Sequence, residues 1–129
     1  MNKVRKNFLV KKGEIVSFDE KWIYDQVGQE GEVEVRAVVE DGGFFRGKGT
    51  IVIAKDVARI NAFLSFKVLL LGKTARAEVQ PELEIDSNDV KASHSASVGQ
   101  VDEEQLFYLM SRGISRPEAV RLIVKAFLN

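Results

Sequence analysis

The fold is decided by residues 51–75, IVIAKDVARINAFLSFKVLLLGKTA, in which apolar and polar side chains alternate. A period of two with many Val, Ile and Leu residues is typical of short β-strands that bury one face. The pattern recurs at an interval of eighteen residues, from Val33, Val35 and Val39 to Ile51, Ile53 and Val57 and then to Leu69, Leu71 and Ala75. A fourth copy follows at a shorter interval, at Leu83, Ile85 and Val90.

Each copy has the organisation of one coil of a solenoid. Two inward apolar positions are followed by a polar turn, such as Lys55-Asp56 or Gly72-Lys73-Thr74, and then by a second short strand. One coil cannot bury its own apolar face, so coils stack and their aligned side chains form a continuous core. We therefore expect a mainly β solenoid, while a sandwich or meander of short strands is the alternative with similar turn spacing.

Residues 1–31 carry a weaker pattern, which predicts irregular strands near residues 14–17 and 22–24. We interpret Asp41-Gly42-Gly43 and Gly47-Lys48-Gly49 as sharp turns, because glycine supplies the positive φ that tight connections need. A phosphate-binding loop is not expected, since the sequence has neither the Lys-Ser/Thr ending of such a loop nor a strand–glycine–helix context.

Two helices are expected in residues 100–129, after a β-solenoid core over residues 1–99. Asp102 is suited to be a helix N-cap, and Gly113 to be a left-handed terminator. Ser115 opens a second helix, with Glu118 completing a capping box. The expected apolar faces are Leu106, Phe107, Leu109 and Met110 on the first helix and Ala119, Val120, Ile123, Val124 and Phe127 on the second. Together the helices form a tight hairpin.

The composition excludes several classes of function. Nineteen basic and nineteen acidic residues cancel, so no overall positive field attracts nucleic acid, and no nucleic-acid partner is expected. The absence of cysteine excludes disulfides, thiolate metal sites and a cysteine nucleophile. The apolar run in the basic N-terminal stretch covers only residues 8–10, which is too short for a signal sequence or a membrane span. We therefore expect no signal sequence and no membrane association. We expect the protein to be cytoplasmic.

Two further functions stay open from the residues alone. The hairpin could present Arg116, Arg121 and Lys125 to DNA, although cations on a helix are more often a solvated face. Glu84, Asp86 and Asp89 could act as acid and base, but on a turn and an outward strand position we expect them to be solvated.

More specific motifs lie in residues 81–128, PELEIDSNDVKASHSASVGQVDEEQLFYLMSRGISRPEAVRLIVKAFL. They include Asp89-Val90-Lys91, Ser93-His94, Val98-Gly99, DEEQLFYL at residues 102–109 and Ser111-Arg112-Gly113-Ile114. With GKGTI at residues 47–51 and LLLG at residues 69–72, these motifs resemble the SufB/SufD family of scaffold proteins of the SUF iron–sulfur cluster assembly system, over residues 43–129.

The resemblance implies a short right-handed parallel β-helix followed by a C-terminal helical hairpin. It also implies a protein that is not itself a hydrolytic enzyme, that pairs with itself or with a SufB/SufD paralogue as a dimer, and that binds a SufC-type ABC ATPase. We expect Glu103, Phe107, Tyr108 and Arg112, with the second helix, to form the ATPase-docking surface, because the capped hairpin matches the family closely.

The resemblance also places His94 where SufD-like members have an interface histidine implicated in the nascent cluster site. A neutral imidazole is a suitable ligand for iron. The sequence departs from the family at three nearby positions: Ala92 and Phe66 stand where relatives have cysteines, and Ser95 where SufB-type chains have glutamate. A lone histidine cannot hold a cluster. We therefore expect no cofactor on this chain alone and a transient iron–sulfur cluster only within a complex.

The alternative to this assignment is a β-solenoid protein-interaction module without cluster chemistry. Such a module would dimerise through its open edge, because an uncapped solenoid invites pairing.

Overall fold

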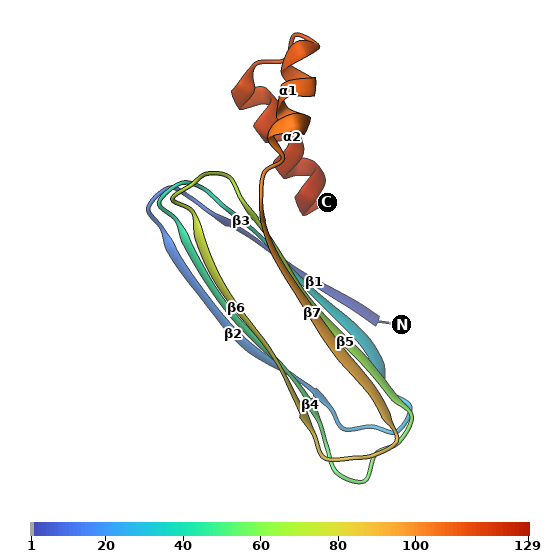
Figure 1. The fold of residues 1–129 in the computed structure, drawn as a ribbon. Helices are drawn as coiled ribbons and strands as arrows, with labels where there is room; N and C mark the ends of the chain where they lie inside the picture. The colour runs from blue at the N-terminus through green and yellow to red at the C-terminus, as the bar shows by residue number, and fades with distance from the viewer. Residues whose placement is uncertain (1) are drawn as a thin grey trace.

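The computed structural model describes residues 2–129, which form seven β-strands and two α-helices. The elements are β1 (Asn2–Val10), β2 (Ile15–Tyr24), β3 (Glu30–Val39), β4 (Phe44–Ile53), β5 (Ile60–Leu70), β6 (Arg76–Ile85), β7 (Val90–Gln100), α1 (Glu103–Ser111) and α2 (Arg116–Leu128). Odd-numbered strands form one parallel sheet, β1-β3-β5-β7, and even-numbered strands form a second, β2-β4-β6. The chain alternates between these two facing layers, so it is a parallel β-solenoid of about three turns (Figure 1). The predicted mainly β solenoid with two C-terminal helices is confirmed.

One coil contains two strands and is longer than the eighteen-residue repeat, so that part of the prediction is wrong. Asn2 pairs with Gly31, 29 residues further on, and Phe44 pairs with Arg76, 32 residues further on. Val33 therefore lies beside Leu64, and not beside Ile51. The eighteen-residue interval instead relates β3 to β4 and β4 to β5, which lie in opposite sheets, because each strand and its turn occupy about half a coil. It does not follow one column of the core, since Val33 and Ile51 belong to the core whereas Leu69 packs against the helices. Periodicity alone did not distinguish half a coil from a whole one.

The N-terminal strands are regular, which corrects the expectation of irregular ones. β1 pairs with β3 along its whole length, and β2 is one continuous strand paired with β4. Their inward side chains build the first layer of the core. The ring centroid of Phe8 lies 5.2 Å from that of Phe18 and 5.3 Å from that of Phe45. These large aromatic side chains make up for the lack of a Val/Ile/Leu pattern in this segment.

Gly47 and Gly49 do not form a turn, contrary to prediction, but lie within β4. A Cβ atom at Gly47 would lie 2.8 Å from the Phe45 ring and 2.9 Å from the Phe66 ring. One at Gly49 would lie 3.1 Å from the Trp22 ring. The two glycines therefore leave room for aromatic rings in the core, which is a packing role that glycine also fills in strands.

The second predicted glycine turn, at residues 41–43, is confirmed, with φ +72° at Gly42. It stacks on the next turn of the same end of the solenoid. The Thr74 hydroxyl donates to the Asp41 carboxylate over 3.0 Å and accepts the backbone N–H of Gly42 over 3.0 Å. Such contacts between stacked turns keep successive coils in register where the strands end. The hydrogen bonds of the sheets keep the coils in register along the strands.

The two helices begin and end where the capping residues predict. Asp102 accepts the Glu104 N–H, and Ser115 accepts the Glu118 N–H. Gly113 has φ +90°. A second apolar cluster, formed by Val101, Leu106 and Ala119 with partly buried neighbours including Leu69, Leu71 and Ile123, attaches the hairpin to the solenoid.

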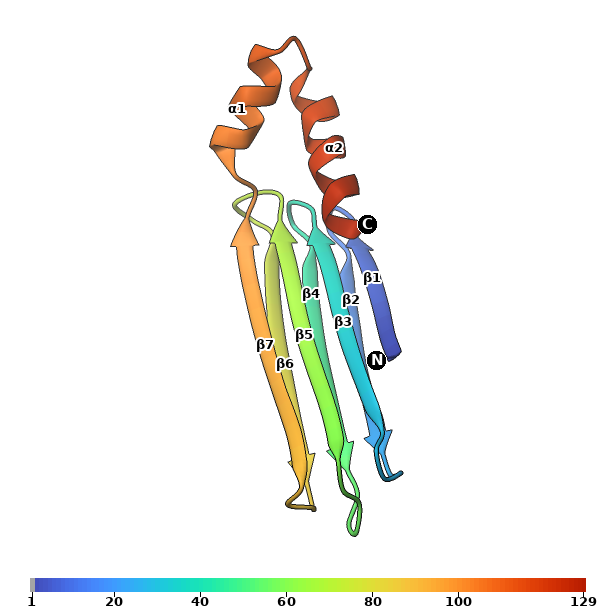
Figure 2. The same ribbon diagram turned by 90° about the vertical axis from the view of Figure 1, so that its right-hand side faces the viewer.

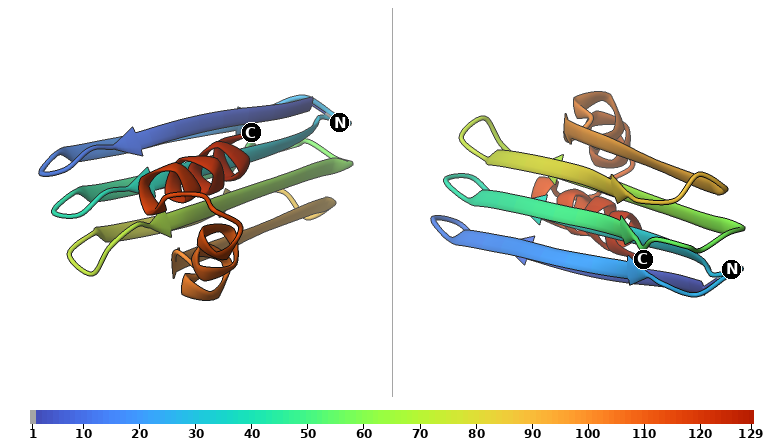
Figure 3. Two further views of the ribbon diagram at one scale, coloured as in Figure 1. Left: turned by 90° about the horizontal axis from the view of Figure 1, so that it is seen from above. Right: turned by 90° about the horizontal axis from the view of Figure 1, so that it is seen from below.

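Both helices lie on the side of the solenoid that is formed by the C-terminal ends of the odd-numbered strands (Figure 2). α1 follows β7, and α2 runs back so that the C-terminus lies close to β1 (Figure 2). Seen from above, α2 crosses the stacked coils while α1 stays at the β7 side (Figure 3, left). Within residues 2–129, no helix is both long and apolar enough to cross a membrane.

Candidate functional site

The last coil of the solenoid is open, and His94 lies on it. His94 pairs in register with Leu64, which pairs with Val33, so the imidazole occupies the inward column of the core. Leu64 and Val33 are buried, whereas His94 is exposed because no further described coil covers β7. Ala92, Ala96 and Val98 are the neighbouring inward positions on the same strand. The sequence motif is thereby placed at an accessible end of the core.

Within the described sheets, the free edge of β7 differs from the other three free edges. The Val101 N–H donates to Leu70 O, which shows that the odd-numbered residues of β7 form the backbone hydrogen bonds to β5. The backbone N–H and C=O groups of the even-numbered residues, including His94, therefore point towards the free edge of the sheet. Residues 92–100 carry no charged side chain. β1 and β2, by contrast, carry several charged residues, and charges are a common protection of edge strands.

β6 is protected by a proline. Arg76 N–H donates to Gly43 O and Asp86 N–H to Ile53 O, so the even-numbered residues of β6 bond to β4. Pro81 is odd-numbered, and its nitrogen, which has no hydrogen, lies at the free edge. Proline at that position interrupts pairing with a further strand. Among the four free edges of the described sheets, β7 alone therefore has neither charges in its central part nor a proline.

The residues around His94 do not form a complete metal or cluster site. No group of three or more His, Cys, Asp or Glu side chains that could hold a metal ion occurs in the described part of the chain. The inward neighbours Ala92 and Ala96 have no ligand atoms, and the chain has no cysteine. An iron–sulfur cluster needs several thiolates or close substitutes. His94 could at most supply one ligand to a cluster whose other ligands come from another chain.

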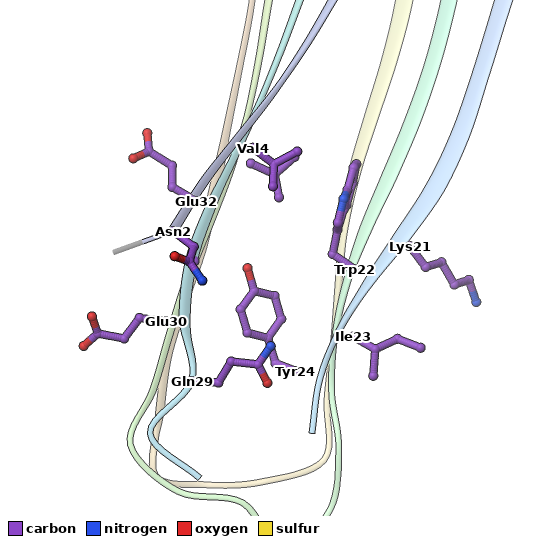
Figure 4. Close-up of a pocket in the computed structure, with 11 residues that line it drawn as sticks. Asn2, Val4, Lys21, Trp22, Ile23, Tyr24, Gln29, Glu30 and Glu32 are labelled. Carbon is purple, nitrogen blue, oxygen red and sulfur yellow. The ribbon is translucent and has the colours of Figure 1, made fainter. Parts of the chain in front are cut away.

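The opposite end of the solenoid contains a cavity of about 380 Å³ between the two sheets. Figure 4 shows Tyr24 reaching into the space between the sheets beside Val4 and Trp22, while Glu30, Glu32 and Lys21 point away from it. Burial raises the pKa of the Tyr24 phenol. Among the described residues, this cavity therefore combines apolar side chains with the Tyr24 hydroxyl and the side-chain amides of Asn2 and Gln29.

The predicted docking residues lie on the exposed side of α1. Phe107 is 75% exposed and Tyr108 is 56% exposed, which corrects the expectation that Phe107 and Met110 face the core with Leu106. The Arg112 guanidinium donates to the Tyr108 hydroxyl over 2.8 Å and lies 5.1 Å from the centre of its ring. Glu103 binds Arg116 of α2 through contacts of 3.1 and 3.3 Å. Large exposed aromatic side chains are typical of protein-binding surfaces.

The residues of the two other functions are not brought together. Glu84 pairs with Lys21 at 3.8 Å, and Asp86 and Asp89 are exposed on the turn before β7. Of the three helix cations, Arg116 pairs with Glu103 and Arg121 pairs with Glu118. The acids therefore do not form a catalytic pair in a cleft, and two of the cations are neutralised by neighbouring carboxylates.

A buried charge cluster around Glu34 was not predicted from the sequence. The Glu34 side chain, on the outer face of β3, is 3% exposed and contacts Arg5, Arg36 and Lys67 at 3.1 Å each and Lys3 at 3.6 Å. Burial alone would raise its pKa, but hydrogen bonds from Arg36, Lys67 and Arg5 and the charge of Arg36 outweigh it and lower the pKa to about 2. In the sequence, Glu34 is simply one polar residue between two valines.

Comparisons with known proteins agree with the geometry. Residues 3–127 match the family described as SUF system FeS cluster assembly, SufBD core domain. The chain is 40% identical over 92 residues to the iron–sulfur cluster assembly protein SufD of Escherichia coli K12, an alignment that covers 71% of this chain and 22% of that protein. It is 39% identical over 124 residues to SufD of Bacillus subtilis 168, covering 95% of this chain and 28% of that one.

An archaeal relative is similar over most of the same region. The chain is 35% identical over 104 residues to a SufBD family protein of Archaeoglobus fulgidus, covering 80% of this chain and 28% of that protein. The chain thus spans less than a third of the length of each of these three relatives.

Proposed function

The chain belongs to the SufBD family of SUF iron–sulfur cluster assembly proteins, and from this premise we propose that it is a non-catalytic accessory scaffold that pairs through β7 and carries a SufC-type ABC ATPase on its helical hairpin. It acts in the cytoplasm in this proposal. The observation that carries it is the placement of the family-like motifs. His94 lies at the open end of the solenoid, and residues 103–112 lie on an exposed helix.

Pairing through β7 follows from the character of its edge. A strand with unpaired N–H and C=O groups and no charges or proline is a template for another strand. The partner is a second copy of this chain or a SufB/SufD paralogue with a similar edge. In either pair, the core-facing side chains of the last coil of each solenoid meet at the interface. On this chain they include His94 and Val98, and Val98 is 45% exposed.

In this arrangement a nascent iron–sulfur cluster is cargo held between two chains. His94 supplies one imidazole ligand, and the partner supplies the thiolates that this chain lacks. A paralogue with cysteines near the same edge fits this requirement, whereas a second copy of this chain does not. The heterodimer is therefore the pair in which a cluster is assembled.

Reconstitution tests the cluster role. The purified chain is mixed with a cysteine-bearing SufB-type paralogue, iron and sulfide without oxygen, and cluster absorbance is recorded. We expect His94→Ala to reduce that absorbance, and the neighbouring outward-facing substitution Ser95→Ala to leave it unchanged. Equal absorbance for the two variants would favour the alternative function, an interaction module without cluster chemistry, which the absence of cysteine also supports.

The docking surface is formed by Glu103, Phe107, Tyr108 and Arg112. Its two aromatic side chains are large and exposed, and the contacts of Arg112 with Tyr108 and of Glu103 with Arg116 hold the surrounding polar groups in place. Exposed aromatic residues framed by fixed polar groups are the usual anchors of a protein interface.

Co-purification with a SufC-type ABC ATPase tests docking. We expect Phe107→Ala to weaken the complex by about 2 kcal/mol, as is typical of an interface anchor. Ile15→Ala is the matched control, because Ile15 is 74% exposed but lies on β2 in the solenoid. An ATPase that binds both variants as tightly as the wild type would refute the assignment of this surface.

A further inference from the structure

The last turn of α2 is held by side chains from the solenoid. The guanidinium of Arg36 on β3 donates to the carbonyl oxygens of Phe127 at 2.5 Å and Asn129 at 3.3 Å. The side-chain amide of Asn7 on β1 donates to Leu128 O at 2.7 Å. The final carbonyls of a helix have no partner within the helix, and a cation there also complements the helix dipole. Residues about a hundred positions earlier in the chain therefore cap α2.

Arg36 is itself fixed by Glu34. One guanidinium nitrogen of Arg36 donates to Glu34 at 3.1 Å, and its guanidinium carbon lies 5.9 Å from the Phe127 ring centre. Glu34 is anchored on both sides, by Lys3 and Arg5 from β1 and by Lys67 from β5. The buried Nε of Arg36 has no hydrogen-bond partner within the described residues, so its desolvation must be offset by these other contacts.

Two separate attachments thus hold α2. Its first half packs through Ala119, Val120 and Ile123 on the apolar cluster, and its last turn is fixed by Arg36 and Asn7. Apolar packing is not directional, whereas charged hydrogen bonds to carbonyl oxygens define a direction. One attachment alone would leave α2 free to swing about the apolar cluster.

The geometry points to Arg36, supported by Glu34, as a positioning residue that fixes the orientation of the helical hairpin on the solenoid. We call Arg36, Glu34 and Asn7 the clamp. The clamp contributes to the direction in which Phe107 and Tyr108 face, because α1 is joined to α2 by a short turn and by the Glu103–Arg116 pair. The connection from β7 and the burial of Leu106 hold α1 at its other end. Its effect on partner binding rests on the proposed function, whereas its effect on hairpin orientation does not.

Distance measurements between two spin labels test the orientation directly. The chain has no cysteine, so Ser17→Cys on β2 and Lys125→Cys on α2, both exposed positions, give one specific pair of labels. We expect one narrow distance distribution in the otherwise wild-type protein and a broad or split distribution after Arg36→Ala. Glu34→Gln, which keeps the shape of the side chain but removes its charge, is expected to broaden the distribution to a lesser degree.

Arg46→Ala is the matched control. Arg46 also forms an ion pair, at 3.5 Å from Glu78, and also lies over an aromatic ring, at 5.2 Å from the centre of Phe44, but it is on the outer face of the other sheet. Its loss should leave the distance distribution unchanged. The fluorescence of Trp22, the single tryptophan, reports whether the solenoid of each variant is folded. Should Arg36→Ala unfold the solenoid, Asn7→Ala, which removes one exposed hydrogen bond of the clamp, takes its place.

ATPase binding by the same variants provides the functional result. If the hairpin is correctly placed in about a tenth of the Arg36→Ala molecules, the affinity falls about tenfold. An unchanged distance distribution in a folded clamp variant would overturn the proposal. A broadened distribution with unchanged ATPase affinity would overturn the link to docking. If the wild type binds no ATPase, the proposed docking function fails, while the distance distributions still decide whether the clamp positions the hairpin.

Discussion

At the scale of single residues, the carboxylate of Glu34 gives the protein a measurable acid dependence. Its pKa in the folded chain is about 2, below the ordinary value of 4.5. A carboxyl whose pKa is depressed on folding contributes stability above its unfolded pKa, and that contribution is lost as the pH falls through the folded value.

We therefore expect Glu34→Gln to be less stable than the wild type near neutral pH and the difference to shrink below about pH 4.5. Urea unfolding midpoints measured from about pH 7 down to about pH 2.5 check this. Glu78→Gln is the control, because Glu78 is an exposed carboxylate with a single, exposed ion-pair partner, Arg46. The expectation would be contradicted if the difference in urea midpoint between Glu34→Gln and the wild type stayed constant down to the lowest pH.

Gly47 is a second residue whose surroundings allow a sharp prediction. The two aromatic rings within 3 Å of a Cβ at this position are buried, so they cannot move aside freely. We expect Gly47→Ala to destabilise the fold by roughly 1–3 kcal/mol, as overpacking of a core does. Chemical denaturation gives the value. Gly99→Ala, on β7, is the control, since a Cβ there meets nothing within 4 Å, and it should be neutral or slightly stabilising.

At the scale of elements, the N-caps separate the stability of the hairpin from that of the solenoid. The Asp102 carboxylate accepts the Glu104 N–H at 2.9 Å. We expect Asp102→Ala to destabilise α1 by about 1 kcal/mol. Amide hydrogen exchange should accelerate in residues 104–112 and stay unchanged in β3 and β5. Ser111→Ala, at the other end of α1, removes a local side-chain contact and no cap, and should have a smaller effect.

The same distinction applies to the two attachments of α2. The apolar cluster forms from residues next to the helices in sequence, such as Val101, and from the end of β5. The clamp joins β1 and β3 to the last turn of α2 and is therefore complete only when the first coils and the last helix are both formed. Loss of the clamp should consequently affect hairpin orientation before it affects the unfolding of the sheets.

At the scale of the whole molecule, the two ends of the solenoid are chemically different, which predicts a discrete pair and not a filament. The β7 end has uncharged central residues, while the β1 and β2 edges carry charges. Pairing of like ends forms a closed two-fold dimer, whereas head-to-tail stacking would continue without limit.

We expect Val98→Lys to convert the dimer to a monomer, because an unpaired ammonium would be buried between the chains. Sedimentation equilibrium measures the mass. Ile23→Lys is the control, since Ile23 is exposed on β2 at the opposite end, and it should not change the mass. Dissociation by the control and not by Val98→Lys would show that the chain pairs through its other end.

From the sequence alone we predicted the β-solenoid, with a sandwich or meander of strands as the alternative, the two helices with their caps, and the resemblance to the SufB/SufD family. These features rest on local signals: the alternation of apolar residues, Asp102 and Ser115 before helical runs, Gly113 after one, and the motif around His94. Such local signals can be recognised in the sequence because each depends on residues that are only a few positions apart. Local signals also gave false results. One is the turn predicted at Gly47–Gly49, because a glycine that makes room for an aromatic ring looks in sequence like a glycine in a turn.

The tertiary structure alone decided the length of the coil, the exposure of Phe107 and the clamp on α2. Coil length depends on which strands pair, and Asn2 meets Gly31 across an intervening strand and two turns. Arg36 meets Phe127 across 91 residues. Glu34 is buried because strands on either side bring cations to it, and nothing in its neighbourhood along the chain indicates that. Contacts between distant segments are set by the stacking of coils, so they become visible only once the chain is folded.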